Sequence, residues 1–180
     1  MNSHFDESTK LVIAQIGKTV GLKGQLKLRP QTDFLEQFKK GVKLESDDLV
    51  LTVESFDKDR LLIKFVGYNT IEEAKQLSTR ELYATVAQSR ELCDLSEGEH
   101  FWFDIIGSTV IEEGQTLGVV DEIERFTGAD YLLVITDDAL VAEGLPKSFL
   151  IPYNDRYIIS VDEKTKTITT KGSKDILEAS

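Results

Sequence analysis

Residues 97–107 read Glu-Gly-Glu-His-Phe-Trp-Phe-Asp-Ile-Ile-Gly, and this stretch decides how the second half of the chain is interpreted. It holds the only tryptophan, and three aromatic residues stand side by side in it: Phe101, Trp102 and Phe103. On a strand, successive side chains point to opposite faces of the sheet. This alternation predicts that the core receives Phe101, Phe103 and Ile105. The opposite face would then carry His100, Trp102 and Asp104.

The outward face of this stretch is the first candidate for a partner-binding surface. Large, rigid aromatic side chains dominate the energetic hot spots of protein interfaces, and Trp102 is such a side chain. An aromatic residue on the outer face of a sheet more often covers the edge of its own fold than binds a partner, so both interpretations stay open. The candidate partner-binding residues on this face are His100, Trp102 and Asp104. Phe101 is a further candidate, although alternation places it inside, because a bulge or turn at residues 98–100 would rotate its ring outward.

Charge is distributed unevenly along the 180 residues. The net charge is −11, yet residues 1–90 carry 14 Lys or Arg against 13 Asp or Glu, whereas residues 91–180 carry 7 against 19. This asymmetry indicates two surfaces with different partners, because an acidic half would repel a phosphate backbone and attract a basic protein. An acidic surface that serves only solubility is the alternative.

The first half alternates apolar and polar residues in the manner of antiparallel strands. We predict strands over residues 11–16, 25–29, 49–56, 61–66 and 82–86. A glycine-punctuated loop is expected over 17–24 and a short helix over 34–39. Thr70-Ile71-Glu72-Glu73 is a capping-box pattern and predicts one clear helix, whose apolar face would carry Ile71, Ala74 and Leu77.

The segment between Ala87 and Gly98 is polar and acidic, and we place the domain boundary there. Beyond it, turn residues separate short strand-like segments over 105–111, 116–124, 131–135, 148–151, 157–161 and 167–169. Short strands with turns at close intervals favour a barrel or sandwich over a doubly wound sheet. The sequence therefore predicts an all-β fold of two small antiparallel β-barrels, residues 1–90 and 91–180, joined by a short linker near 87–98, with one or two short helices.

Motifs for catalysis or metal binding are missing from the sequence. Gly17-Lys18-Thr19 lacks the glycine five positions earlier that a P-loop needs, since Val12 stands there. The two histidines share no ligand spacing and the acidic pairs lie in turns or at helix starts, so we predict no metal and no cofactor. A serine triad would lack a nucleophile elbow, and Cys93 with His100 as a catalytic pair would lie beside a domain linker. We expect a protein that is not an enzyme.

The compartment can also be inferred. No apolar run approaches the length of a membrane span, and the polar, acidic N-terminus is neither a signal peptide nor a transit peptide. The single Cys93 cannot form an internal disulfide, which fits a reducing compartment. We expect a cytoplasmic monomer that does not bind membranes.

A basic stretch in the first half is the second candidate surface. From Lys18 to Lys43 there are seven Lys or Arg against two acidic residues. Clustered positive charges can meet phosphate with little sequence specificity, although a solvated strand face that keeps an acidic protein soluble explains them equally well. The candidate contacts to RNA or to an RNA-containing particle are Lys18, Gly21, Lys23, Gly24, Lys27 and Arg29.

Short motifs through both halves, taken in order, resemble the family of the ribosome maturation factor RimM. In the first half the likeness rests on Ile16-Gly17-Lys18, on residues 20–28, 32–33, 38–41 and 62–67, and on Glu72-Glu73-Ala74 with Leu77. In the second half it rests on residues 101–107, 116–120, 130–132, 150–152 and 161–162. Family members often carry Ala-His before the second loop glycine and a tyrosine pair ahead of the tryptophan. Here these positions are Thr19-Val20 and His100-Phe101.

The resemblance implies an N-terminal RimM-type barrel and a C-terminal PRC-barrel-like domain. It further implies a non-catalytic assembly factor for maturation of the small ribosomal subunit, chiefly of its head, and for rRNA processing. The implied partners are a basic small-subunit ribosomal protein of the head and the precursor small subunit, with direct contact to rRNA left open. The alternative is a general RNA-binding or translation-factor-like β-barrel module, in which the basic stretch matters and the aromatic cluster is only core.

Overall fold

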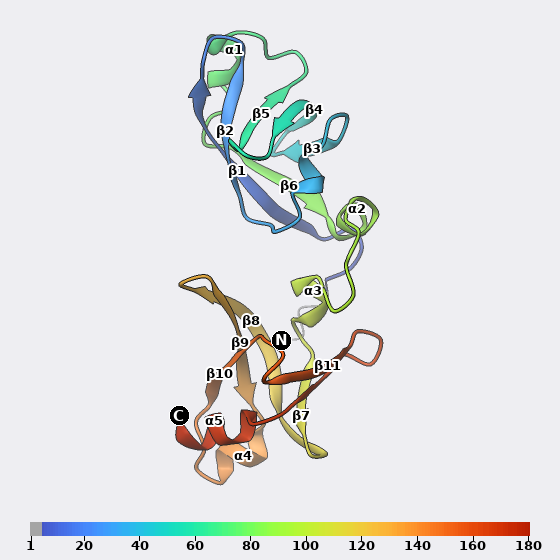
Figure 1. The fold of residues 1–180 in the computed structure, drawn as a ribbon, viewed down its shortest axis with the longest axis vertical. Coiled ribbons are helices and arrows are strands. Elements are labelled where there is room, and N and C mark those ends of the chain that lie inside the picture. Colours follow the sequence, from blue (N-terminus) through green and yellow to red (C-terminus); the bar gives the residue numbers. More distant parts are fainter. Residues whose placement is uncertain (1–4) are drawn as a thin grey trace. The chain divides into compact units, whose positions relative to one another are not determined.

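A computed structural model describes residues 5–180, and most of these residues fall into two compact units. The first unit is Asp6–Leu95, drawn from blue to green in Figure 1, and the second contains Ser96–Ser180, drawn from yellow-green to red. Each unit is built mainly from strands, so the predicted all-β class is confirmed. Within the described part of the chain, no helix is both long and apolar enough to cross a membrane.

Six strands form the sheet of the first unit: β1 Lys10–Val20, β2 Gln25–Pro30, β3 Lys43–Ser46, β4 Leu49–Asp57, β5 Leu62–Phe65 and β6 Glu81–Thr85. Their hydrogen-bonded order is β1-β2-β5-β4-β3-β6, and β6 also pairs with β1, so the sheet returns on itself. The loop predicted over 17–24 is shorter than expected, since β1 continues to Val20 and only 21–24 form the turn. β3 was not predicted.

Alternating side chains along these strands fill the first core. In β2, Leu26 and Leu28 are buried while Lys27 and Arg29 are exposed, as the alternation predicted. Each fully buried large apolar side chain stabilises the fold by about 1.5–3 kcal/mol. The short helix predicted near 34–39 is present as the 3-10 helix η1 (Leu35–Phe38). The ring of its last residue, Phe38, is fully buried.

The helix predicted from the capping box is present as α1 (Ile71–Lys75). The Glu73 N–H donates to the Thr70 hydroxyl at 3.2 Å, and the Glu73 carboxylate accepts from the backbone N–H groups of Asn69 and Thr70 at 2.8 and 3.0 Å. These backbone hydrogen bonds lower the pKa of Glu73, since they favour the charged carboxylate. Ala74 in the helix and Leu77 just after it are buried, and these two side chains pack the helix against the barrel.

The segment predicted as a linker contains a helix, α2 (Val86–Leu92). The Thr85 hydroxyl caps it by accepting from the Gln88 N–H at 3.1 Å. Inside the helix, Ser89 is buried and its hydroxyl accepts a hydrogen bond from Gln37 of η1 at 2.8 Å. The stretch without helix or strand is therefore residues 93–101, which begins later than the predicted linker of 87–98.

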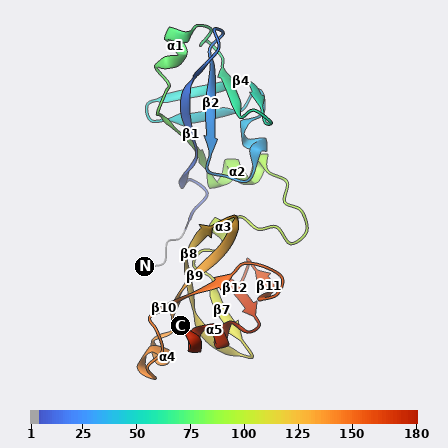
Figure 2. The same ribbon diagram turned by 60° about the vertical axis from the view of Figure 1, so that its left-hand side comes forward.

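The second unit also has a six-stranded sheet: β7 Thr109–Glu112, β8 Gln115–Phe126, β9 Ala129–Thr136, β10 Ser148–Pro152, β11 Ile158–Asp162 and β12 Thr167–Thr170. The strand order is β10-β9-β8-β7-β12-β11, with β12 between β7 and β11 (Figure 2). One pair differs from the antiparallel prediction, because β12 runs parallel to β7. A hairpin turn therefore cannot set the register between these two strands.

Three short helices complete the second unit: α3 Trp102–Ile105, α4 Asp138–Ala142 and α5 Ser173–Ala179. Residues 5–180 thus hold more short helices than the one or two predicted. Glu112 of β7 fixes the start of α5, since its carboxylate accepts from the N–H groups of Gly172 and Ser173 at 3.0 and 2.8 Å. Leu177 of α5 is fully buried in the second core, so the helix closes one side of that core.

Candidate functional site

The aromatic stretch forms the one-turn helix α3, not the predicted strand. The Ile106 N–H bonds to the Trp102 carbonyl at 2.9 Å, and Gly107 then takes a φ of +82° before β7 begins at Thr109. A helix turns about 100° per residue, whereas strand side chains alternate by about 180°. The strict alternation of a strand therefore does not decide which side chains of this stretch are buried.

Burial in α3 agrees with the sequence analysis for most positions. The core receives Phe101, Phe103 and Ile105, as predicted, and Trp102 is 38% exposed. The outward placement of Asp104 is wrong, because this residue is only 6% exposed. Helical rotation, and not the alternation of a strand, turns Asp104 toward the body of the unit. Trp102 is thus the aromatic side chain of the cluster that solvent or a partner can reach.

Two buried contacts hold α3 in place. The rings of Phe101 and Phe103 stack with centroids 4.8 Å apart and planes 10° from parallel. Lys166 donates its ammonium to the carbonyls of Phe103 and Asp104, at 3.5 and 2.7 Å. A cation at the C-terminal carbonyls of a helix is electrostatically favourable. Phe101 and Asp104, both candidates for partner contact, therefore help to hold the helix that carries Trp102.

His100 lies beside a separate hollow of the second unit. Its Nδ1 is 2.6 Å from a carboxylate oxygen of Glu163, and its side chain is 19% exposed. The cavity next to it has a volume of about 220 Å³, and its lining includes Tyr153, Asn154 and Ile159. Ile159 is 61% exposed. The lining of the hollow thus combines the exposed apolar side chain of Ile159 with the exposed carboxylate of Asp155, which suits a basic side chain with an aliphatic stem.

Tyr153 keeps its proton in this hollow. Burial raises the pKa of the Tyr153 phenol, and the carboxylates of Glu163 and Asp130 raise it further. The phenol is therefore neutral at physiological pH and can donate a hydrogen bond to a ligand. Sequence reasoning missed Tyr153 and Ile159, because nothing in the chain order brings 153–161 next to His100.

The basic candidates of the first half lie on and beside the β1–β2 hairpin. Five of them are exposed: Lys18, Gly21, Lys23, Lys27 and Arg29. The Lys27 ammonium donates to the Arg60 carbonyl at 2.5 Å, so this side chain is already engaged. Leu22 at the hairpin turn is 79% exposed, and sequence reasoning did not select it. The sequence signal that could have identified Leu22 is an apolar residue placed between a turn glycine and a lysine.

Gly24 is buried and has a structural role. A Cβ at this position would lie 2.0 Å from the Tyr68 carbonyl oxygen, and the backbone φ is +81°. Only glycine allows so close an approach together with this conformation. The hairpin turn therefore packs against the loop after β5, where Val66 is 56% exposed. Leu22 and Val66 thus add apolar surface beside the lysines.

Metal and thiol chemistry find no support among the described residues. Within residues 5–180, no group of three or more His, Cys, Asp or Glu side chains is placed to hold a metal ion. Cys93 is buried, and burial, followed by the nearby charge of Glu36, raises the pKa of its thiol to about 11. A thiol that stays protonated is a poor nucleophile.

Comparison with known proteins gives one consistent match. Residues 11–89 match the RimM N-terminal domain and residues 102–176 match the RimM PRC barrel domain. The ribosome maturation factor RimM of Sulfurovum sp. (strain NBC37-1) is 54% identical over 168 residues, which cover 93% of this chain and 94% of that protein. The RimM of Sulfurimonas denitrificans is 50% identical over 176 residues, covering 97% and 98%.

A more distant relative has the same name. The RimM of Helicobacter pylori (strain Shi470) is 41% identical over 180 residues, covering 94% of this chain and 98% of that protein. A crystal structure of RimM from Pseudomonas aeruginosa is 20% identical and superposes with a TM-score of 0.40, covering 93% of this chain and 99% of that chain.

Proposed function

This chain belongs to the RimM family, and on that premise we propose that it is a non-catalytic assembly factor for the small ribosomal subunit that supports rRNA processing in the cytoplasm. The observation that carries the proposal is the match of both halves to RimM domains in chain order, over 11–89 and 102–176. Relatives at 54% and 50% identity are named ribosome maturation factors.

The second unit would hold a basic small-subunit ribosomal protein of the head. Residues 91–180 carry 7 Lys or Arg against 19 Asp or Glu, which attracts a basic protein over several ångströms before contact. Trp102 would supply the aromatic anchor, and the hollow beside His100, which the carboxylate of Asp155 helps to line, would accept a basic side chain. Both features occur in the same unit.

The first unit would face the precursor subunit. Lys18, Lys23 and Arg29 are exposed on or beside the β1–β2 hairpin, and Leu22 extends from its turn. Positive side chains can contact rRNA phosphates without reading sequence, while an exposed apolar tip adds contact area. This proposal places rRNA contact on the first unit and protein contact mainly on the second.

The division of charge suggests how such a factor would work without catalysis. A basic ribosomal protein bound to an acidic surface is shielded from nonspecific RNA, because its positive charges are already matched. When its rRNA site has folded, the higher charge density of RNA can compete for it. The factor then dissociates unchanged.

Depletion of the protein from cells tests the proposed function. We expect unprocessed 16S rRNA precursor and free small subunits to accumulate, and expression of the full chain to reverse both effects. Precursor ends are measured by primer extension and subunits by sucrose-gradient sedimentation. Normal rRNA ends and a normal subunit ratio after complete depletion would refute the proposal.

A further inference from the structure

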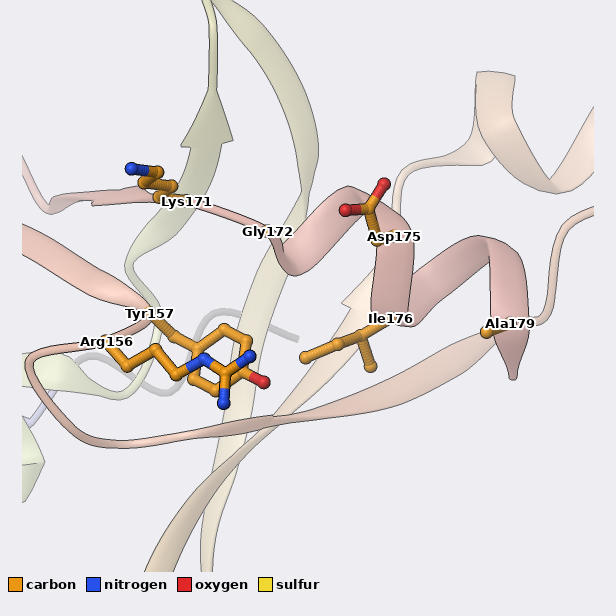
Figure 3. A pocket seen from close by; sticks show the side chains of 7 residues that line it. All are labelled: Arg156, Tyr157, Lys171, Gly172, Asp175, Ile176 and Ala179. Atoms are coloured by element: carbon orange, nitrogen blue, oxygen red, sulfur yellow. The ribbon is translucent and has the colours of Figure 1, made fainter.

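A second, larger cavity of the second unit involves none of the residues discussed above as candidate contacts. Its volume is about 520 Å³, and it lies between the loop that precedes β11 and the helix α5 (Figure 3). The side chains that define it are those of Arg156, Tyr157, Lys171, Asp175 and Ile176. Volumes of roughly 300–1,000 Å³ are usual for small-molecule sites.

A cation–π contact between a guanidinium and an aromatic ring forms one wall of this cavity. The Arg156 guanidinium carbon is 5.3 Å from the centroid of the Tyr157 ring. A Cβ added at Gly172 would lie 3.8 Å from the same ring, so the backbone at Gly172 runs close to the ring. Figure 3 shows the Ile176 side chain extending toward the ring. The exposed guanidinium of Arg156 is therefore held at the surface over a supported aromatic ring.

The charge of this cavity is opposite to that of its domain. Two of the seven cations in residues 91–180 line it, and neither Arg156 nor Lys171 forms an ion pair with any residue in 5–180. By contrast, Arg125 is paired with Asp130 at 2.6 Å. Asp175 is the one acidic side chain of the lining, which leaves the cavity with one net positive charge. That charge balances a single phosphodiester.

We propose that this cavity binds one nucleotide of unpaired RNA, with its base stacked on the Arg156 guanidinium and its phosphate beside Lys171. Arginine planes and aromatic rings are the platforms on which proteins stack unpaired bases, and lysine is a compact partner for a phosphate. A paired base hides its faces inside the helix. The acidic surface around the cavity would also repel a long duplex backbone.

An acidic peptide fits the cavity less well than a nucleotide does. A carboxylate could pair with Arg156 or Lys171, but it has no planar face to lay on the exposed Arg156 guanidinium. A nucleotide base has such a face, and a single phosphodiester neutralises the net charge of the cavity, while the ribose and base supply donors that the Asp175 carboxylate can accept.

Nuclear magnetic resonance of the full, ¹⁵N-labelled chain tests the site. Adenosine monophosphate should shift the backbone amide signals of Tyr157 and Gly172 in a saturable way, at concentrations where adenosine alone and inorganic phosphate alone have smaller effects. Arg156→Ala and Lys171→Ala should each weaken this binding by roughly tenfold, the range for loss of one stacked or charged contact. Lys164→Ala, which removes an exposed lysine outside the cavity, should bind as the parent chain does.

The source of the nucleotide is decided by a second set of titrations. A single-stranded oligoribonucleotide of five adenosines should shift the same two amides at lower concentration than the mononucleotide, and the same strand annealed to its complement should not. Tighter binding of the mononucleotide than of the oligonucleotide would overturn the assignment to RNA. Unmoved Tyr157 and Gly172 signals, phosphate alone acting as strongly as the nucleotide, or full binding by Arg156→Ala would overturn the site itself.

Discussion

Trp102 and Phe103 are adjacent in α3, yet their side chains have opposite surroundings. Phe103 is 3% exposed and stacks on Phe101, whereas Trp102 is 38% exposed. A buried ring contributes to the free energy of folding, and an exposed one is available to a partner. Substitutions at these two positions should therefore separate stability from binding.

Phe103→Ala should lower the free energy of unfolding of the second unit by about 3 kcal/mol, because it leaves a large cavity in the core. Trp102→Ala should lower it by less than about 1 kcal/mol, since much of that ring is in solvent already. Thermal and denaturant unfolding of the two full-length variants measure both effects. An unfolded Trp102→Ala beside an unaffected Phe103→Ala would show that the two roles are reversed.

Cys93 provides a pH prediction at the residue scale. Burial raises the pKa of this thiol to about 11, from a value of 9.0 in the unfolded chain. The folded state then holds the proton more tightly, so the group stabilises the fold below about pH 9 and this contribution is lost as the pH rises toward 11. We expect the parent chain to lose more stability over that interval than Cys93→Ala does.

Alkylation of the native chain independently checks that the Cys93 thiol is buried and protonated. Iodoacetamide at pH 8 should modify Cys93 slowly in the native protein and rapidly after unfolding in guanidinium, because only the thiolate reacts and only the unfolded thiol is accessible. Mass spectrometry follows the reaction. Rapid labelling of the native chain would contradict the buried, protonated thiol.

At the scale of elements, the alternating strands and the helices η1 and α1 were predictable, whereas the helices α2 to α5 were not. β2 and α1 carry their own signals, alternation in the one and a capping box in the other. α3 has four residues, too few to be stable by local preference, so tertiary packing decides its conformation. The parallel pair β7–β12 joins residues about sixty positions apart, and nothing local specifies that pairing.

The candidate sites were predictable to different degrees for the same reason. Trp102 could be selected because a large aromatic residue in a polar neighbourhood stands out in the sequence. The burial of Asp104 depends on helical rotation and the position of Tyr153 on long-range folding, so neither could be derived from the sequence. Gly24 was selected as a candidate contact, whereas its surroundings give it a packing role against Tyr68.

Gly24→Ala should destabilise the first unit by about 2 kcal/mol or more, because the added Cβ clashes with a carbonyl and the φ of +81° is unfavourable for alanine. Gly21→Ala is the matched control. Its φ is +69°, but its added Cβ meets nothing within 4 Å, so only the conformational cost of about 1 kcal/mol applies. Denaturant unfolding compares the two variants, and equal losses would contradict the close approach of the hairpin to Tyr68.

At the scale of the whole molecule, the two halves differ in charge and each has its own core. We therefore predict that each half folds on its own, and that limited proteolysis cuts first within residues 93–101, the stretch without helix or strand. Cleavage inside α2 should be slower, because Val86 and Ser89 are buried. Mass spectrometry of the fragments locates the cuts, and an unfolded fragment 1–95 would contradict separate folding.

The charge asymmetry also predicts how association depends on salt. If an acidic surface steers a basic partner, the association rate should fall as ionic strength rises from about 0.05 M to about 0.15 M, since screening shortens the range of attraction. Stopped-flow mixing of the full chain with precursor small subunits measures this rate. A rate that does not change with salt would exclude electrostatic steering.

Binding of the full chain to precursor small subunits, measured by co-sedimentation, tests the proposed function most directly. We predict that Trp102→Ala binds roughly 30-fold more weakly, equivalent to about 2 kcal/mol at an interface hot spot. Phe126→Ala removes an aromatic ring of the same unit that is 48% exposed, and it should bind as the parent chain does. Unchanged binding by Trp102→Ala, or equal binding of the parent chain to large subunits, would contradict a small-subunit assembly factor that uses this surface.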